Sequence, residues 1–360
     1  MEQTYAIELK NITKRFGKIV ANDGINLKVK RGEILSLLGE NGSGKTTLMN
    51  MISGIYFPDE GHILVDGKAV SIRSPKDSFD LGIGMIHQHF KLIDVMTAAE
   101  NIILGLKGNA VLDMKTVHKE IQELVDRYGF DLDPAQKVYT MSVSQKQTVE
   151  IVKMLYRGAN ILILDEPTAV LTPQEVDKLF EVLRNMRDDG RAIIIITHKL
   201  NEVLELSDRV AILRKGKYIG TLQTSEATVE SLTEMMVGEK VSLDINRPMP
   251  HDLKKRLTIN NITCTNEDGL HVLENVSFEA FGGEVLGVAG ISGSGQKELL
   301  EAIAGLTKLS SGSVIFHSPE GEDIDLAKYD AAQINELGVR HSFVPEDRLG
   351  MGLVGSMGMT

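Results

Sequence analysis

Two kinds of hydrophobic pattern occur along the first part of the chain. Apolar and polar residues alternate in Tyr5–Lys10 and Gly24–Lys30, which predicts paired strands with one buried face and a turn near Gly17 and Asn22–Gly24. Other runs are apolar at almost every position, as in strands buried on both faces of a parallel sheet: 33–38, 161–164 and 192–196. Apolar residues three and four apart predict helices over 47–52, 113–128 and 173–186. Together these patterns predict an α/β fold.

A glycine-rich loop follows the first continuous apolar run. It consists of Gly39, Glu40, Asn41, Gly42, Ser43, Gly44, Lys45 and Thr46. This G-x-x-x-x-G-K-[ST] pattern lies between a predicted strand and a helix that starts at Thr47, so backbone N–H groups and the positive helix end can surround phosphates. Lys45 is expected to reach the β- and γ-phosphates, and the Thr46 hydroxyl to bind Mg²⁺. Thr47 is expected to bind ATP together with the loop residues. We therefore expect the chain to bind a nucleoside triphosphate.

Polar residues end two of the later buried runs. Asp165 and Glu166 are adjacent carboxylates at the end of a strand, where burial is costly without a cation or a chemical task. Near a phosphate-binding loop, Asp165 is expected to hold Mg²⁺ and Glu166 to polarise the attacking water. His198 follows the next buried run and is expected to contact the γ-phosphate. Phe16 precedes the loop and is a candidate to stack on the nucleotide base, with packing in the hairpin as the alternative.

The composition adds constraints on partners and location. The 360 residues carry a net charge of -11, which argues against the basic surface that nucleic acids normally require. Cys264 is a lone cysteine, so no intramolecular disulfide can form, and we expect it to be half-buried in a strand. No apolar run approaches the roughly 18–20 residues of a membrane-spanning helix, and the polar N-terminus differs from a signal peptide. We expect a cytosolic protein that reaches a membrane only through a partner.

In this order, the motifs resemble the nucleotide-binding domain of ATP-binding-cassette (ABC) proteins. The resemblance implies a P-loop NTPase fold with a mostly parallel sheet core, an antiparallel β subdomain and a helical insert at about 90–158, in a first domain over 1–237. ATP and Mg²⁺ are the implied cofactors, and Gln88 would sense Mg²⁺ and the γ-phosphate. The implied signature motif is Met141, Ser142, Val143, Ser144 and Gln145. Two positions depart from the family pattern, because Ser144 replaces a glycine and Thr172 replaces an aspartate.

An internal repeat follows the first domain. Ile7–Thr13 is echoed by Leu257–Thr263, after a predicted linker over 238–256. The second domain, 257–360, contains a second loop with Gly290, Gly293, Gly295 and Gln296. Gln296 stands at the lysine position and Lys297 at the Mg²⁺-binding hydroxyl position. We expect this loop to hold a nucleotide weakly and not to hydrolyse it.

The resemblance also predicts how the two domains share their sites. In ABC proteins two domains meet head to tail, and each site joins one domain's loop to the other domain's signature. The altered signature at Ser144 would then face the altered loop at Gln296, which predicts one working and one degenerate site. No second signature, Asp-Glu pair or switch histidine follows the second loop. We therefore expect the second domain to be incomplete and the chain alone to hydrolyse ATP poorly.

Several features resemble the ATPase subunits of bacterial simple-sugar and nucleoside importers. These are the tandem domains, the second loop without lysine, and the runs Asp165–Pro173 and Pro345–Arg348. Tyr156–Asn160 favours the nucleoside branch. The implied partners are membrane permease subunits, docking near Gln88 to Asn101, and indirectly an extracytoplasmic solute-binding protein. This would make the protein peripheral on the cytoplasmic face of the membrane. A soluble tandem-cassette ATPase acting on ribosomes or DNA, and a non-catalytic ATP-binding fragment, stay open as alternatives.

Overall fold

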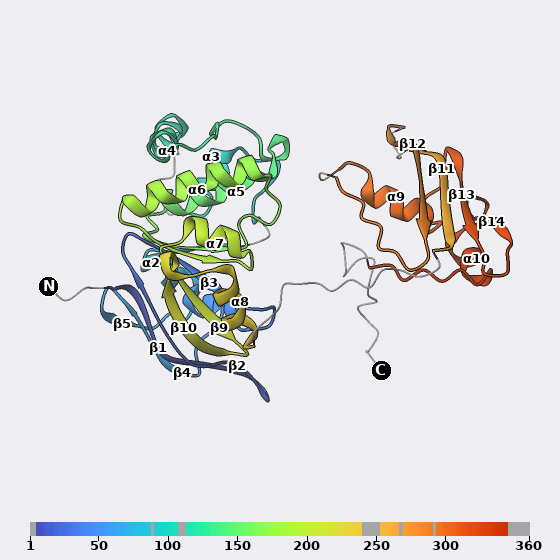
Figure 1. Ribbon diagram of the computed structural model, residues 1–360. Coiled ribbons are helices and arrows are strands. Elements are labelled where there is room, and N and C mark those ends of the chain that lie inside the picture. The colour runs from blue at the N-terminus through green and yellow to red at the C-terminus, as the bar shows by residue number, and fades with distance from the viewer. Residues whose placement is uncertain are drawn as a thin grey trace. The chain divides into compact units, whose positions relative to one another are not determined.

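The chain forms two compact units, Met1–Leu243 and Asp244–Thr360. The computed structural model describes residues 5–87, 90–106, 113–239, 253–265, 269–290 and 293–344, and Figure 1 shows its elements in chain order. The boundary between the units lies inside the stretch 238–256. No helix within the described ranges combines the length and apolar character needed to cross a bilayer.

A six-stranded sheet forms the centre of the first unit. Its order is β10 (Lys217–Gln223), β9 (Arg209–Arg214), β3 (Glu33–Leu38), β8 (Ala192–Ile196), β7 (Ile161–Asp165) and β6 (Ile83–Ile86). The pairs from β9 to β6 are parallel, and only β10 pairs antiparallel with β9. All residues of β3 and β8 are buried. The continuous apolar runs therefore correctly predicted a mostly parallel sheet covered on both faces.

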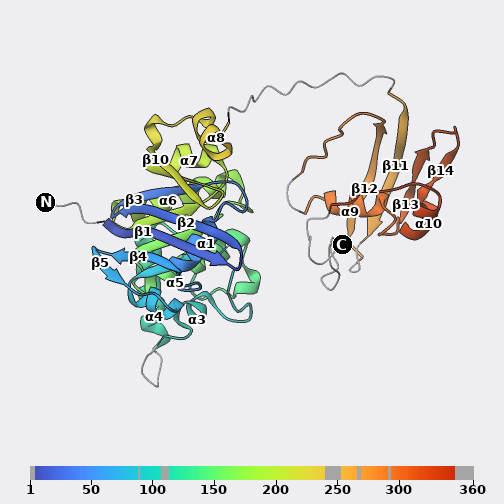
Figure 2. The same cartoon turned by 90° about the horizontal axis from the view of Figure 1, so that it is seen from below.

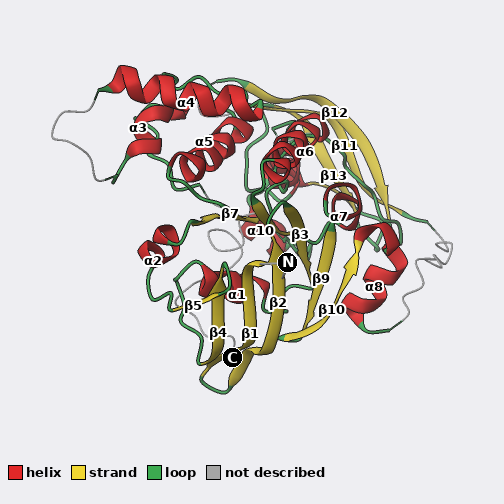
Figure 3. Ribbon diagram, turned by 90° about the vertical axis from the view of Figure 1, so that its left-hand side faces the viewer, coloured by secondary structure: helices red, strands yellow, loops and turns green. Residues whose placement is uncertain are grey.

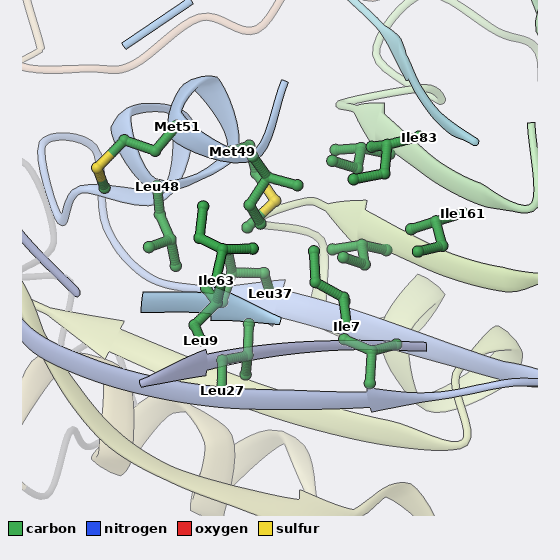
Figure 4. Close-up of a cluster of buried hydrophobic side chains, with 14 of the residues drawn as sticks. Ile7, Leu9, Leu27, Leu37, Leu48, Met49, Met51, Ile63, Ile83 and Ile161 are labelled. Carbon is green, nitrogen blue, oxygen red and sulfur yellow. The ribbon is translucent and has the colours of Figure 1, made fainter. Parts of the chain in front are cut away.

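Successive residues of β7 pack into different hydrophobic cores, as expected for side chains that alternate between the faces of a strand. Ile161 and Ile163 belong to the core that contains helix α1 (Lys45–Ile52), whereas Leu162 and Leu164 pack with helix α6 (Pro173–Asp188). Figure 4 shows the first of these cores, with Leu48 and Met49 of α1 close to Leu37 of β3. The glycine-rich loop thus lies between two tightly packed elements.

A second, antiparallel sheet completes this core, in the order β2 (Ile19–Lys30), β1 (Tyr5–Phe16), β4 (Glu60–Val65) and β5 (Lys68–Val70). Its strands are seen from below in Figure 2. Ile7 pairs with Val29, and both are buried. The predicted turn at Asn22–Gly24 is wrong, because these residues lie within β2. They form a bulge opposite Thr13, where Gly24 has a φ of 60° and donates its N–H to Thr13 Oγ1.

Helices α3 (Ala98–Ile103), α4 (Met114–Tyr128) and α5 (Val143–Tyr156) surround a core of their own, and Figure 3 shows them grouped together. The predicted apolar face of α4 is buried at Val117, Ile121, Val125 and Tyr128, and the Asp113 side chain caps the helix. Shorter helices complete the unit: α2 (Pro75–Asp80), α7 (Leu200–Leu206) and α8 (Val229–Val237).

The second unit repeats the antiparallel sheet of the first, with strands in the order β12 (His271–Phe281), β11 (Lys255–Thr265), β13 (Ser311–His317) and β14 (Asp323–Asp325). Within its described residues it also contains helices α9 (Gln296–Ile303) and α10 (Ala331–Glu336). Cys264 in β11 is fully buried rather than half-buried. The segment before the second loop, which corresponds to β3, is not a strand, and Val285 within it is fully exposed.

Candidate nucleotide-binding site

The functional residues of the first unit gather at one edge of the parallel sheet. The glycine-rich loop follows β3, Asp165 ends β7, and His198 follows β8. These three strands are neighbours in the order β3-β8-β7. The carboxyl ends of neighbouring parallel strands meet at the same edge of a sheet, which is where ligands bind in open α/β folds. The topology therefore brings together residues that are far apart in the sequence.

Two glycines let the loop pass close to other backbone segments. A Cβ at Gly39 would collide with Leu213 O, and one at Gly44 would collide with Ala21 O. Gly44 also has a φ of 95°, in the left-handed region that favours glycine, and it directly precedes α1. Residues 41–47, from the loop and the first turn of α1, line a cavity.

The Lys45 side chain lies inside the glycine-rich loop and donates hydrogen bonds to its carbonyl groups. Its side chain is largely buried, and Nζ donates to Gly39 O at 2.7 Å and to Glu40 O at 2.9 Å. Burial lowers the pKa of Lys45, and the nearby carboxylates of Glu166 and Asp165 oppose that decrease. The ammonium group is thus held between the loop and the carboxylates that end β7.

A cavity of about 410 Å³ lies at the loop. Its walls include residues 41–47, the carboxylates of Asp165 and Glu166, and Ile19, Val20 and Lys215. The Thr46 hydroxyl and the Asp165 carboxylate supply the oxygen ligands that Mg²⁺ prefers. The backbone of a glycine loop, a lysine and a helix N-terminus suit polyphosphate. The residues present therefore fit both ATP and Mg²⁺.

Asp165 carries a free acceptor group in this cavity. Its carboxylate makes no hydrogen bond within the part of the chain that the structure describes, and it is half-buried. Burial raises the pKa of Asp165, the neighbouring Glu166 raises it further, and Lys45 opposes the increase. A divalent cation would favour the ionised form, so this environment suits a metal ligand better than an isolated anion.

Glu166 has a strained backbone and one defined side-chain partner. Its φ is 47°, in the left-handed region, although its N–H still bonds to Ile196 O at 2.9 Å. Such strain costs about 1–3 kcal/mol and tends to occur at functional sites. Glu166 Oε1 lies 3.0 Å from His198 Nδ1. The structure thus brings together the carboxylate and the histidine that the sequence singled out.

Phe16 does not line the loop cavity. Its ring packs edge to face against Tyr56, with ring centroids 5.2 Å apart, and Lys14 Nζ lies 5.6 Å from its centroid. The side chain is still 43% exposed, so base stacking by Phe16 stays a prediction. Ile19 and Val20, from the adjoining hairpin, line the cavity instead and were missed in the sequence analysis, where only the alternation of the hairpin could have indicated them.

The signature residues form the start of α5 rather than part of the loop cavity. Ser142 Oγ accepts from Gln145 N at 3.2 Å, and Gln145 Oε1 accepts from Ser142 N at 3.1 Å. This capping box leaves Val143 exposed and Ser144 half-buried. A separate groove of about 340 Å³ runs from this helix start to α6. Within the first unit, the signature residues therefore do not line the cavity of the glycine-rich loop.

The described residues at the end of the second loop resemble those of the first, but they lack its lysine. Gly295 precedes α9 with a φ of 92°, as Gly44 precedes α1. Gln296 Nε2 donates to Gly290 O at 3.3 Å, in the place of the Lys45 bond to Gly39 O. Lys297 forms an ion pair along its own helix with Glu301, at 3.7 Å. Gln88 and the run Pro345–Arg348 lie outside the described residues.

The strand, loop, helix and strand-end carboxylates define the class of P-loop nucleoside triphosphatases. Residues 22–169 match the family model described as ABC transporter. The chain is 45% identical over 356 residues to the nucleoside import ATP-binding protein NupA of Lactococcus lactis subsp. cremoris, covering 98% of this chain and 69% of that protein. The guanosine import ATP-binding protein NupO of Bacillus subtilis is 45% identical, with 97% of this chain and 68% of that protein covered.

Solved structures agree with this assignment. The structure of cbiO1 from Clostridium perfringens, part of the ABC transporter complex cbiONQ, has a TM-score of 0.57 and 29% identity, covering 65% of this chain and 95% of that one. The chain belongs to the ABC transporter family. As in that family generally, it is an ATPase that binds ATP with Mg²⁺, and the predicted fold and cofactors are confirmed.

Proposed function

We propose that this chain is the ATP-binding and hydrolysing subunit of an importer for a nucleoside or a simple sugar. The observation that carries the proposal is the 45% identity, over nearly the whole chain, to proteins named for nucleoside and guanosine import. A glucose import ATP-binding protein, TsgD13 of Haloferax volcanii, is 43% identical. Nucleosides are therefore the first solutes to test and sugars the second.

In this proposal each side chain of the site has its own role in ATP hydrolysis. Lys45 and the loop backbone hold the β- and γ-phosphates, while Thr46, Asp165 and Gln88 hold Mg²⁺. The metal ion, when bound, neutralises charge that develops on the phosphate oxygens. Glu166 orients and polarises the attacking water, and the bond between His198 and Glu166 fixes the direction of the carboxylate. Phe16 stacks on the base.

The proposed permease docking segment, Gln88 to Asn101, borders a groove that supports it. This groove has a volume of about 240 Å³ and is lined by Lys91, Glu150 and Arg157 among apolar residues. Glu150 Oε1 and Arg157 Nε are buried without a hydrogen-bond partner among the described residues, although Glu150 Oε1 lies 3.5 Å from Lys153 Nζ as an ion pair. Val95 in the docking segment is 74% exposed. A partner helix with apolar and polar side chains would cover the exposed groups of this segment. Through the permease, the protein would be peripheral on the cytoplasmic face of the membrane.

The two loops support a proposal of one working and one degenerate site. Lys45 and Gln296 bond to equivalent loop carbonyls, but only Lys45 brings a positive charge. Hydrogen bonds to charged groups contribute about 1.5–3 kcal/mol, more than neutral ones. The second loop should therefore bind nucleotide more weakly than the first.

Restoring the charge of the second loop should strengthen its nucleotide binding. In a Lys45→Ala background, which isolates the second loop, we expect Gln296→Lys to raise the affinity for ATP about 10-fold or more, because it restores a charge-assisted bond to phosphate. Titration with a fluorescent ATP analogue measures the change, and Gln296→Ala serves as the uncharged control. An affinity that is equal in the Lys and Ala variants would contradict a degenerate loop limited by charge.

The importer proposal is tested by uptake in the native host. Cells that carry Lys45→Ala in this chain are supplied with labelled guanosine or labelled ribose. We expect the uptake of one of them to fall to background, because the first loop supplies the energy for transport. The Lys119→Ala change, on an exposed side chain of α4, is the matched control. If neither solute is affected, the importer function for these classes is wrong.

A further inference from the structure

A small cavity adjoins the two carboxylates that end β7. Its volume is about 30 Å³, and its polar walls are the side chains of Gln147 in α5, His87 after β6, and Asp165 and Glu166. A buried water needs about 10–15 Å³ of such volume and two to four polar partners. The cavity therefore has the size and the polarity for a single water molecule.

Gln147 is a nearly buried polar residue whose place in this cavity is not accounted for by any hydrogen bond of its side chain. It is only 4% exposed, yet its carboxamide makes no hydrogen bond to any residue that the structure describes. Its carboxamide keeps some exposure to these spaces, because it is not among the fully buried polar atoms that lack a partner. The Asp165 carboxylate in the same cavity likewise lacks a hydrogen-bond partner among the described side chains and backbone groups. A donor and an acceptor thus face one space of water size.

We infer that Gln147 holds a water molecule in this cavity that hydrogen-bonds to the carboxylates of Asp165 and Glu166, which makes Gln147 a positioning residue for ATP hydrolysis. The carboxamide N–H donates to the water oxygen, and the water donates to the carboxylates. Glu166 already bonds through Oε1 to His198. A water on its other side would fix the carboxylate plane, and a carboxylate still has lone pairs left for the attacking water. The inference rests on the proposed role of Glu166.

The position of Gln147 also connects this water to the signature. Gln147 lies one turn beyond Ser144 on α5, and it lines the groove at the start of that helix as well as the small cavity. A displacement of the helix start therefore moves the carboxamide relative to Asp165. Gln147 therefore links contact at the signature to the orientation of the Asp165 and Glu166 carboxylates.

The first test is a crystal structure of the full chain without nucleotide, at a resolution that shows ordered water. We expect a water within hydrogen-bond distance of the Gln147 carboxamide and of Asp165 or Glu166. The Gln147→Met variant keeps the length of the side chain and removes its hydrogen bonds, so the water should be lost. A wild-type cavity without ordered water overturns the inference, whatever the activity of the variants.

The second test separates positioning from binding. In single-turnover hydrolysis with the chain in excess over ATP, Gln147→Met should lower the rate about 10- to 100-fold, the usual effect of losing a residue that orients another. Its affinity for ATP should stay within about 2-fold of wild type, since the loop cavity is untouched. Gln122→Met, on the exposed face of α4, is the matched control.

A Glu166→Gln variant measured in parallel separates the two proposals. If Glu166→Gln stops hydrolysis and Gln147→Met does not slow it, the inference about Gln147 is wrong and the role of Glu166 stands. If Glu166→Gln leaves the rate unchanged, the proposed role of Glu166 is wrong. The crystal structure alone then shows whether Gln147 holds a water in this cavity.

Discussion

Replacing Glu166 by glutamine is expected to lower ATP hydrolysis about 10²- to 10⁴-fold, the range that a general base contributes. Glutamine has nearly the same shape and keeps a hydrogen-bond partner for His198, which lies 3.0 Å from Glu166 Oε1. It cannot accept a proton from the attacking water. ATP binding should persist, because Lys45 and the loop backbone remain in place. Single-turnover hydrolysis and binding of a fluorescent ATP analogue, measured on the same preparation, give the two values.

The matched control is Glu123→Gln, a glutamate on the exposed side of α4 that pairs with Lys119, at 3.8 Å. Exposed ion pairs of this kind contribute little to stability, so this variant should behave as wild type. If Glu166→Gln retained more than a trace of activity, another group would have to polarise the water, and the proposed single working site would be wrong.

Replacing Lys45 by alanine is expected to weaken ATP binding about 10- to 150-fold, which corresponds to the roughly 1.5–3 kcal/mol of a hydrogen bond to a charged group. Lys45 is only 7% exposed, and its ammonium group lies between the loop carbonyls and the carboxylates of β7. Without it, the loop keeps its N–H groups but loses the one cation that the described loop residues offer to phosphate. Hydrolysis falls with binding.

Isothermal titration with MgATP measures this loss, with Lys119→Ala as the control for removing an exposed lysine. Thermal unfolding without nucleotide should be measured too, because Gly39 O and Glu40 O lose a donor in the variant. Unchanged affinity in a folded Lys45→Ala protein would mean that phosphate does not enter this loop, and it would refute the proposed site rather than the fold.

Several elements could be predicted from the sequence because their signals are local. Strands β3, β7 and β8 appear as continuous apolar runs since both faces of the sheet are covered. Helix α4 appears as a period of three and four with a capping Asp113. The bulge at Asp23 and Gly24 was mistaken for a turn, because bulges and turns use the same residues with left-handed backbone.

The cavity walls were harder to predict because they come from elements without a motif. Ile19 and Val20 reach the loop cavity through the hairpin of β1 and β2, and Lys215 through the turn between β9 and β10. Gln147 looks like any polar residue of an amphipathic helix in the sequence. Only the packing of α5 against the end of β7 gives its carboxamide a place in a small polar cavity.

By itself, the sequence determined the parts whose geometry depends on neighbours along the chain. These are the loop from Gly39 to Thr46, the helix that follows it, and the adjacent acids Asp165 and Glu166. The tertiary structure decided that these parts form one site, through the strand order β3-β8-β7. Parallel pairing joins segments distant in sequence through backbone hydrogen bonds, which are the same for every side chain. No local pattern therefore encodes which strand lies beside which, and the meeting of Lys45 with Asp165 is a property of the fold.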